Sequence, residues 1–163
     1  MKTPSHKYWL IVASKDHIAR GIEWGIAQAC HGNCDPLSKM KAGDRIVFYS
    51  SKLKFEGGNS KANQCHAFTA LATVNEEDKP YQVTVSDEFN PWRIKVDFDT
   101  DMQDVPVKKL LNELEFITNK KSWGMSFRNG HRSIAREDFL KFESAMKSTP
   151  LNGSMSITEL SQP

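Results

Sequence analysis

The clearest strand signal in this chain of 163 residues is the stretch WRIKVDF at residues 92–98. Successive side chains of a β-strand point to opposite faces, so alternation of apolar and polar residues indicates a strand with one face in a core. In this stretch Trp92, Ile94, Val96 and Phe98 share one face, and Arg93, Lys95 and Asp97 share the other. We therefore expect a sheet with one wet face at this strand.

Other apolar stretches predict four more strands and two or three helices. The strands are expected at residues 8–13, 45–50, 65–74 and 81–86, and the helices at 15–24, from Pro106 onward, and at 136–147. The order β-α-β-β-β-β-α-α does not fit a parallel sheet with helices on both faces. It favours an α+β fold in which a small mixed barrel carries helices at its ends.

Length and composition are those of one globular domain. Hydrophobic residues make up 39% of the chain and charged residues 26%, and no apolar run approaches the roughly 20 residues that span a bilayer. We expect no membrane association, and three cysteines without an export signal predict a cytoplasmic protein. Residues 6–147 are the expected domain, and the polar composition of 148–163 predicts a flexible tail.

Charge is distributed unevenly although the net charge is only +2. Residues 39–54 hold five Lys or Arg against Asp44 alone, and residues 118–136 hold five and no acid. Each segment could be an unrelated solvated face. If the two meet in the folded protein, a polyanion such as nucleic acid is the expected partner.

Cysteines and histidines gather in GIAQACHGNCDPL at residues 25–37, which raises the question of a metal site. The candidate ligands are Cys30, His31, Cys34, Cys65 and His66. The Cys-x3-Cys spacing lacks the tight turn of most zinc knuckles, and neighbours on a strand point to opposite faces. We expect no metal and interpret the thiols as small apolar groups.

Catalytic motifs are also absent from the sequence. Cys30 or Ser50 with His31 as base would need an orienting carboxylate, and no nucleophile elbow, phosphate-binding glycine loop or dinucleotide fingerprint occurs. We expect neither an enzyme nor a bound cofactor, and keep a Cys/His hydrolase as a minor alternative.

Several aromatic residues at element ends stand beside cations: Trp92 by Arg93, Trp123 by Lys120 and Lys121, and Phe127 by Arg128. Aromatic faces stack on bases and neighbouring cations bind phosphates, although a tryptophan is more often part of a core.

Many short motifs in order resemble the EVE domain, a PUA-like family related to the YTH readers of methylated adenine. They are IAQACHG (26–32), PLSKMKAGD (36–44), FYSSK (48–52), HAFTA (66–70), PWR (91–93) with VDF (96–98), LEFI (114–117), WG (123–124), FR (127–128) and EDF (137–139). The resemblance covers about residues 7–147. It implies a small bent barrel that reads a modified base in RNA or DNA without catalysis.

The resemblance also implies a pocket where the loop after the first strand and helix faces the end of the second strand. The residues expected to bind the base are Trp24, Ala27, Gln28, His31, Gly32, Tyr49, Ser50, Ser51, Trp92, Trp123 and Phe127, and those expected to bind phosphate are Lys39, Lys52, Arg93 and Arg128. Glycines and small residues let backbone groups approach the base edge, and Gln28 adds an amide. A monomer is the expected state, and a pocket for a free nucleoside is the alternative function.

Overall fold

The computed structural model describes residues 6–29, 32, 34–58 and 60–147. Its strands are β1 (Tyr8–Val12), β2 (Ile26–Ala27), β3 (Arg45–Lys52), β4 (Gln64–Val74), β5 (Tyr81–Gln82), β6 (Trp92–Phe98), β7 (Val105–Pro106) and β8 (His131–Ile134). Its helices are α1 (Lys15–Trp24), α2 (Cys34–Ser38), α3 (Val107–Leu110) and α4 (Arg136–Lys147), with 3-10 turns η2 (Lys61–Asn63) and η3 (Trp123–Phe127). No helix in the described part of the chain is both long and apolar enough to cross a membrane.

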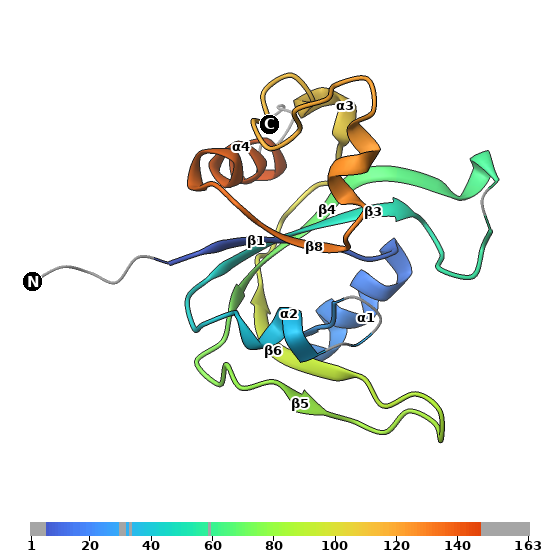
Figure 1. Ribbon diagram of the computed structural model, residues 1–163, viewed down its shortest axis with the longest axis vertical. Helices are drawn as coiled ribbons and strands as arrows, with labels where there is room; N and C mark the ends of the chain where they lie inside the picture. The colour runs from blue at the N-terminus through green and yellow to red at the C-terminus, as the bar shows by residue number, and fades with distance from the viewer. Residues whose placement is uncertain (1–5, 30–31, 33, 59, 148–163) are drawn as a thin grey trace, which may run out of the picture.

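The strands form one curled mixed sheet in the order β2-β6-β4-β3-β1-β8, with β5 beside β6 and β7 beside β4. β1 and β3 run parallel, and the remaining pairs are antiparallel. Figure 1 shows α3 and α4 on one side of the sheet and α1 and α2 on the other. The α+β expectation of a small, bent, mixed sheet with flanking helices is therefore confirmed.

The central strands are buried on both faces, because each face carries its own core. In β3, Ile46 and Phe48 belong to the core with α1 and α2, whereas Val47 and Tyr49 belong to the core with α3 and α4. Such strands carry continuous apolar runs instead of alternation. At the outer strand β6, Lys95 and Asp97 are exposed, as the alternation predicts.

A β-bulge in β4 changes which face each residue meets. Phe48 pairs with Ala70 and Tyr49 with Phe68, so Thr69 is the extra residue between them. Its hydroxyl lies 2.8 Å from the hydroxyl of the fully buried Ser50. The bulge lets Phe68 enter one core and Ala70 the other, and bulges of this kind bend a strand.

Asp44 joins β1 to the start of β3. Its carboxylate is buried and accepts three hydrogen bonds of 3.0 Å, from the backbone N–H groups of Lys7 and Lys41 and from the Trp9 indole. A buried carboxylate is tolerated only when such donors surround it. This contact sets the relative position of the two parallel strands.

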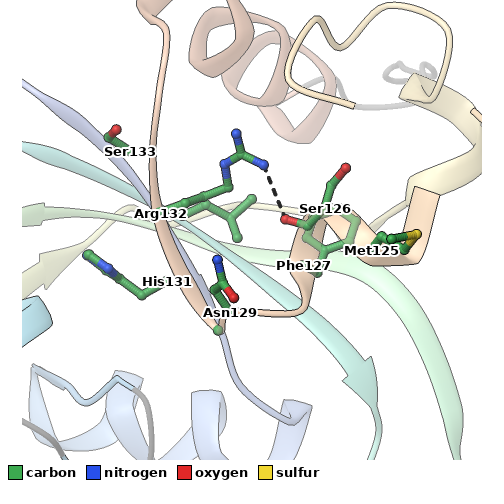
Figure 2. Close-up of a pocket in the computed structure, with 9 residues that line it drawn as sticks. Met125, Ser126, Phe127, Asn129, His131, Arg132 and Ser133 are labelled. Atoms are coloured by element: carbon green, nitrogen blue, oxygen red, sulfur yellow. Dashed lines mark hydrogen bonds between the residues drawn. The ribbon is translucent and has the colours of Figure 1, made fainter. Parts of the chain in front are cut away.

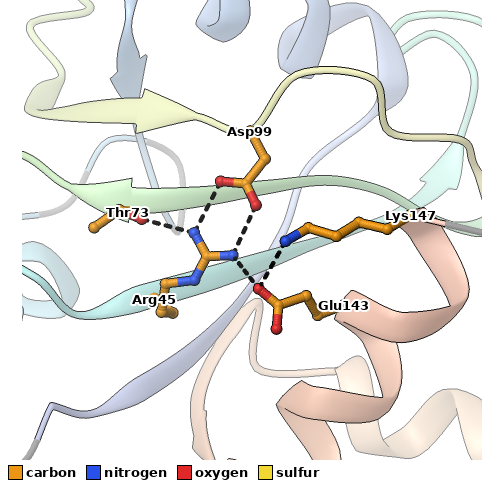
Figure 3. A network of polar contacts seen from close by, with 5 residues as sticks. All are labelled: Arg45, Thr73, Asp99, Glu143 and Lys147. Carbon is orange, nitrogen blue, oxygen red and sulfur yellow. Dashed lines mark hydrogen bonds and ion pairs between the residues drawn. The ribbon is translucent and has the colours of Figure 1, made fainter.

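Arg45, the residue after Asp44, connects the same end of β3 to α4 (Figure 3). Its guanidinium donates to both carboxylate oxygens of Asp99 at 2.8 and 2.9 Å, to Glu143 at 3.1 Å and to the Thr73 hydroxyl at 2.6 Å. The hydrogen bonds from Arg45 hold the pKa of the Asp99 carboxyl below its usual range. The network attaches the C-terminal helix to β3.

Local sequence patterns located the long elements and missed the short ones. The strand at 8–13, the helices at 15–24 and 136–147, and the strands at 45–50, 65–74 and 92–98 are confirmed within two residues. The strand expected at 81–86 is shorter, and β2, β8 and α2 were not predicted because two to five residues carry no readable periodicity. The predicted tail at 148–163 lies outside the described residues.

Asp44→Ala should lower the free energy of unfolding by about 3–5 kcal/mol, because it leaves three donors unpaired in the protein interior. Urea denaturation of both proteins measures the difference. Asp87→Ala, at an exposed loop position, is the control and should change stability by less than about 0.5 kcal/mol. A loss below about 1 kcal/mol for Asp44→Ala would contradict this account of the β1–β3 junction.

Acid should weaken the contribution of Asp99. The ordinary pKa of an aspartate carboxyl is 3.8, and folding lowers the pKa of Asp99 below this value. The ionised carboxyl therefore stabilises the protein above pH 3.8, and this stabilisation is lost as the pH falls through the lowered pKa. Asp99→Asn should therefore be less stable than the parent at pH 7, and the gap should narrow below about pH 4. Urea denaturation across this pH range tests it, and a gap independent of pH would refute it. Asp87→Asn serves as the control.

Candidate functional site

A cleft of about 870 Å³, called here the α1 cleft, opens beside helix α1. It is lined from α1, the chain around β2, the end of β3 and three loops, at residues 55–56, 85–89 and 127–130. Small-molecule sites commonly have volumes of about 300–1,000 Å³. The α1 cleft is therefore large enough for a base with its sugar.

Trp24, the last residue of α1, forms an aromatic part of the cleft wall. Gly25 ends the helix in the left-handed conformation at φ 68°, and its N–H donates to the Gly21 carbonyl. The chain thereby passes directly into β2, where Ala27 pairs with Ile94 of β6. Trp24 is left 52% exposed at the cleft.

Trp24, Gln28 and Arg93 form a connected group along the cleft wall. The Arg93 guanidinium lies over the Trp24 ring, 5.0 Å from its centroid. Arg93 Nε donates to Gln28 Oε1 at 2.6 Å. The cation expected to bind phosphate is thus engaged with two residues expected to bind the base.

Apolar side chains remain exposed around the rim of the cleft. Trp24, Phe55, Val85 and Phe89 are 41–56% exposed although they come from three separate segments. Exposed apolar groups that gather in one place usually mark an interaction site. Phe48 and Phe98, with ring centroids 5.4 Å apart, lie beneath them.

Backbone contacts place Phe55 in a defined position. Its N–H donates to Asp16 on α1 at 3.2 Å, and its ring stacks on His17 at 5.1 Å. Asn63 holds the same loop through hydrogen bonds of 2.9 Å to the backbone of Lys54 and Gly58. The β3–β4 loop is therefore tied to the N-terminal turn of α1.

Cations outnumber acids in the α1 cleft. The charged residues that line it are Arg20, Lys52, Arg93 and Arg128, with Glu56 as the acid. Lys52 and Arg128 come from the two basic segments of the sequence. These segments meet because Phe127 stacks on Tyr49, with ring centroids 3.9 Å apart and planes inclined by 11°. An anionic ligand is favoured at this mouth.

Gly32 lines the cleft, and its backbone lies very close to Pro91. Its φ is +86°, and a Cβ atom there would lie 2.6 Å from the Pro91 Cβ. Its N–H donates to the Ala29 carbonyl at 3.0 Å. Only glycine fits this position without strain, because the chain packs directly against Pro91 here.

Nine residues of the predicted site line the α1 cleft: Trp24, Ala27, Gln28, Gly32, Ser51, Lys52, Arg93, Phe127 and Arg128. Five others lie elsewhere: Tyr49, Ser50, Trp92, Trp123 and Lys39. His31 falls outside the described residues.

The residues that lie elsewhere are used mainly for packing. Tyr49 is buried in the core with α4, and burial raises the pKa of its phenol. Trp123 packs edge-on against Tyr49 at 6.5 Å, and Ser50 is buried against Thr69. Trp92 is half-buried against the other core.

Sequence reasoning missed Phe55, Val85, Phe89, His17 and Arg20, which also line the cleft. Phe55 and Phe89 stand in polar loops, where no regular element is available to bury them. Large apolar residues in such loops were the available signal, and the hydrogen bond from Phe55 to Asp16 that holds one of these loops at the cleft joins residues far apart in the chain.

A smaller pocket of about 270 Å³ lies beside β8 (Figure 2). It shares Phe127, Asn129 and Gly130 with the α1 cleft. Arg132 reaches the Ser126 carbonyl at 3.3 Å, as Figure 2 shows. The loop at residues 127–130 therefore borders both the smaller pocket and the α1 cleft.

His131 lines the smaller pocket and stacks on Trp9 at 5.1 Å. Burial lowers the pKa of its imidazole, and the positive charge of Lys39 lowers it further. The Nε2 atom of His131 and the Nε atom of Arg132 are buried without a hydrogen-bond partner in the described structure.

Thiols show no arrangement for metal binding or nucleophilic attack within the part of the chain that is described. Cys34 and Cys65 are free and partly buried, and no group of three or more His, Cys, Asp or Glu could hold a metal there. Burial raises the pKa of the Cys65 thiol, which disfavours the reactive thiolate. Cys30 lies outside the described residues.

Comparison with known proteins relates the chain to one family. A model of the EVE domain matches residues 7–145. A UPF0310 protein of Mycolicibacterium vanbaalenii is 43% identical over 138 residues, covering 85% of this chain and 91% of that protein. The UPF0310 protein YdcG of Bacillus subtilis is 34% identical over 140 residues, with 85% and 91% covered.

Among solved structures, the Pho92 YTH domain in complex with m6A resembles this chain with a TM-score of 0.55. The match covers 93% of this chain and 90% of the YTH domain at 14% identity. At this identity the likeness shows a shared fold.

Gly32→Ala should destabilise the protein more than Gly58→Ala. Both glycines have positive φ, but a Cβ at Gly58 meets nothing within 4 Å, whereas one at Gly32 meets Pro91. We expect about 1 kcal/mol for Gly58→Ala and at least about 2 kcal/mol for Gly32→Ala, measured by urea denaturation. Equal losses would show that Pro91 moves aside at no cost.

Proposed function

This chain belongs to the EVE domain family, and we propose that it binds a modified base of RNA or DNA in the α1 cleft without catalysing a reaction. The family membership expected from the motif series is confirmed. The observation that carries the proposal is the convergence of exposed aromatic rings, an amide and several cations on one cleft. The YTH domain of the same fold, solved with m6A, supports it.

Stacking supplies the first part of the binding energy. Trp24, Phe55 and Phe89 present partly exposed rings at the cleft. Each base–aromatic contact contributes about 1–3 kcal/mol, and extruding a base from a stack costs a few kcal/mol. One or two of these rings offset that cost, which is smallest for a base that is already unpaired.

Polar groups along β2 and the end of β3 would recognise the base edge. Gln28 contributes an amide and Ser51 a hydroxyl, and the backbone near Ala29 and Gly32 adds donors and acceptors. A methyl or hydroxymethyl group on the base would rest on the apolar surface formed by Phe48, Phe98 and neighbouring aliphatic residues.

Phosphates on either side of the base would contact Lys52, Arg128 and Arg20 at the mouth of the cleft. Such contacts position a strand without reading its sequence, and they make affinity dependent on salt. Recognition without catalysis is supported by this combination of stacking, amide and cationic groups, which binds a nucleotide without supplying an activated nucleophile.

Binding to short single-stranded oligonucleotides tests the proposal. Each oligonucleotide carries one central base, either unmodified cytosine or adenine, 5-methylcytosine, 5-hydroxymethylcytosine or N6-methyladenine, in RNA and DNA at two salt concentrations. We expect tighter binding to one modified base and weaker binding at high salt. No binding, or affinity that does not change with salt, overturns the proposal; equal affinity for the free nucleoside would favour a small-molecule pocket.

Trp24→Ala should weaken binding of the preferred oligonucleotide by about 10- to 100-fold, because it removes one stacking surface. Lys52→Gln and Arg128→Gln should each reduce the slope of log affinity against log salt by about 1. Fluorescence anisotropy measures both effects. Leu140→Ala, at an exposed position on α4, is the control and should change neither quantity.

A further inference from the structure

The orientation of the Gln28 amide is determined by its partner. Arg93 Nε lies 2.6 Å from Gln28 Oε1. A guanidinium has only N–H donors, so the atom that faces it must be the amide oxygen. The opposite orientation would place two donor groups against each other. The amide NH2 group of Gln28 therefore points away from Arg93.

Arg93 is itself held in place on the sheet. It lies in β6, where it pairs with Tyr81 of β5, and the β2–β6 register places Gln28 opposite it. Its guanidinium also covers the Trp24 ring at 5.0 Å. Two independent contacts thus fix the donor that orients Gln28.

The Gln28 NH2 group has no hydrogen-bond partner among the described residues, although the side chain is half-buried and lines the α1 cleft. An amide NH2 can only donate hydrogen bonds. A ligand in the cleft must offer it an acceptor, because an amine or ring N–H placed there would leave two donors facing each other.

The bases considered above share one such acceptor on their Watson–Crick edge. Methylated adenine and modified cytosine carry an exocyclic amine, which is a donor, next to an unprotonated ring nitrogen, N1 of adenine or N3 of cytosine. Guanine carries N1–H at the corresponding position, and uracil and thymine carry N3–H.

Building on the proposed function, we propose that Gln28 is the specificity-determining residue of the cleft, donating to N1 of an adenine or N3 of a cytosine. Arg93 is the positioning residue that holds the amide in the donating orientation. In this placement the cleft prefers bases of the adenine and cytosine type to guanine, uracil and thymine of the same shape, whose ring N–H would face the amide donor.

Matched pairs of bases test this selection. Thymine and 5-methylcytosine carry the same ring methyl group and differ only at position 4 and at the proton on N3. Hypoxanthine and adenine differ in the same way at position 6 and N1. The wild-type protein should prefer the base with the free ring nitrogen in at least one pair by about 10- to 100-fold.

Three variants separate selection from affinity. Gln28→Met keeps the length of the side chain without the donor and should bring the preference within about 3-fold. Gln28→Glu turns the donor into an acceptor and should shift the preference toward the base with the ring N–H. Arg93→Met frees the amide to present either end and should also reduce the preference. Gln103→Met, at an exposed position near α4, is the matched control.

The ratio of the two affinities is the readout, because a merely structural role of Gln28 would weaken both bases equally. An unchanged ratio in Gln28→Met overturns the assignment while leaving modified-base binding intact. Failure of the wild-type protein to bind any of the oligonucleotides overturns the proposed function itself. A wild-type preference for thymine or hypoxanthine also overturns the assignment.

Discussion

Burial of β1, β3 and β4 on both faces is the constraint on which the rest of this structure depends. Adjacent residues of β3 enter different cores, so a register slip of one residue would exchange the contents of the two. Asp44 secures the parallel pair at one end through three donors, and Arg45 ties the sheet to α4. The Thr69 bulge then adjusts the alternation where the sheet bends.

The α1 cleft exists because the core on the α1 side is not closed. Helix α1 covers only part of that face, and the segments around it come from loops that are tied down by their own hydrogen bonds, as at Phe55 and Asp16. Large apolar side chains remain exposed to water there, which is unfavourable, and a bound aromatic ligand would cover them. The same loops bring Lys52 and Arg128 to the mouth of the cleft.

The cations that line this cleft fall into two groups with different contacts. Arg93 contacts Trp24 and Gln28 in the cleft wall, and its hydrogen bond orients the Gln28 amide. Lys52, Arg20 and Arg128 line the cleft as sources of positive potential. Under the proposed function, attraction of a nucleic-acid strand and discrimination between bases therefore depend on different residues of the cleft.

The sequence by itself determined the long elements, because β6 alternates, β1, β3 and β4 contain long apolar runs, and α4 carries an apolar stripe at helical spacing. Family motifs predicted Gln28, Lys52 and Arg93 as site residues, and the aromatic residues at element ends added Trp24; all four line the cleft. Only the tertiary structure decided that Tyr49 and Trp123 belong to a core and that Phe55 and Phe89 face the cleft. The face that a side chain meets depends on strand register, on one bulge and on loop hydrogen bonds, and these contacts join residues far apart in the chain.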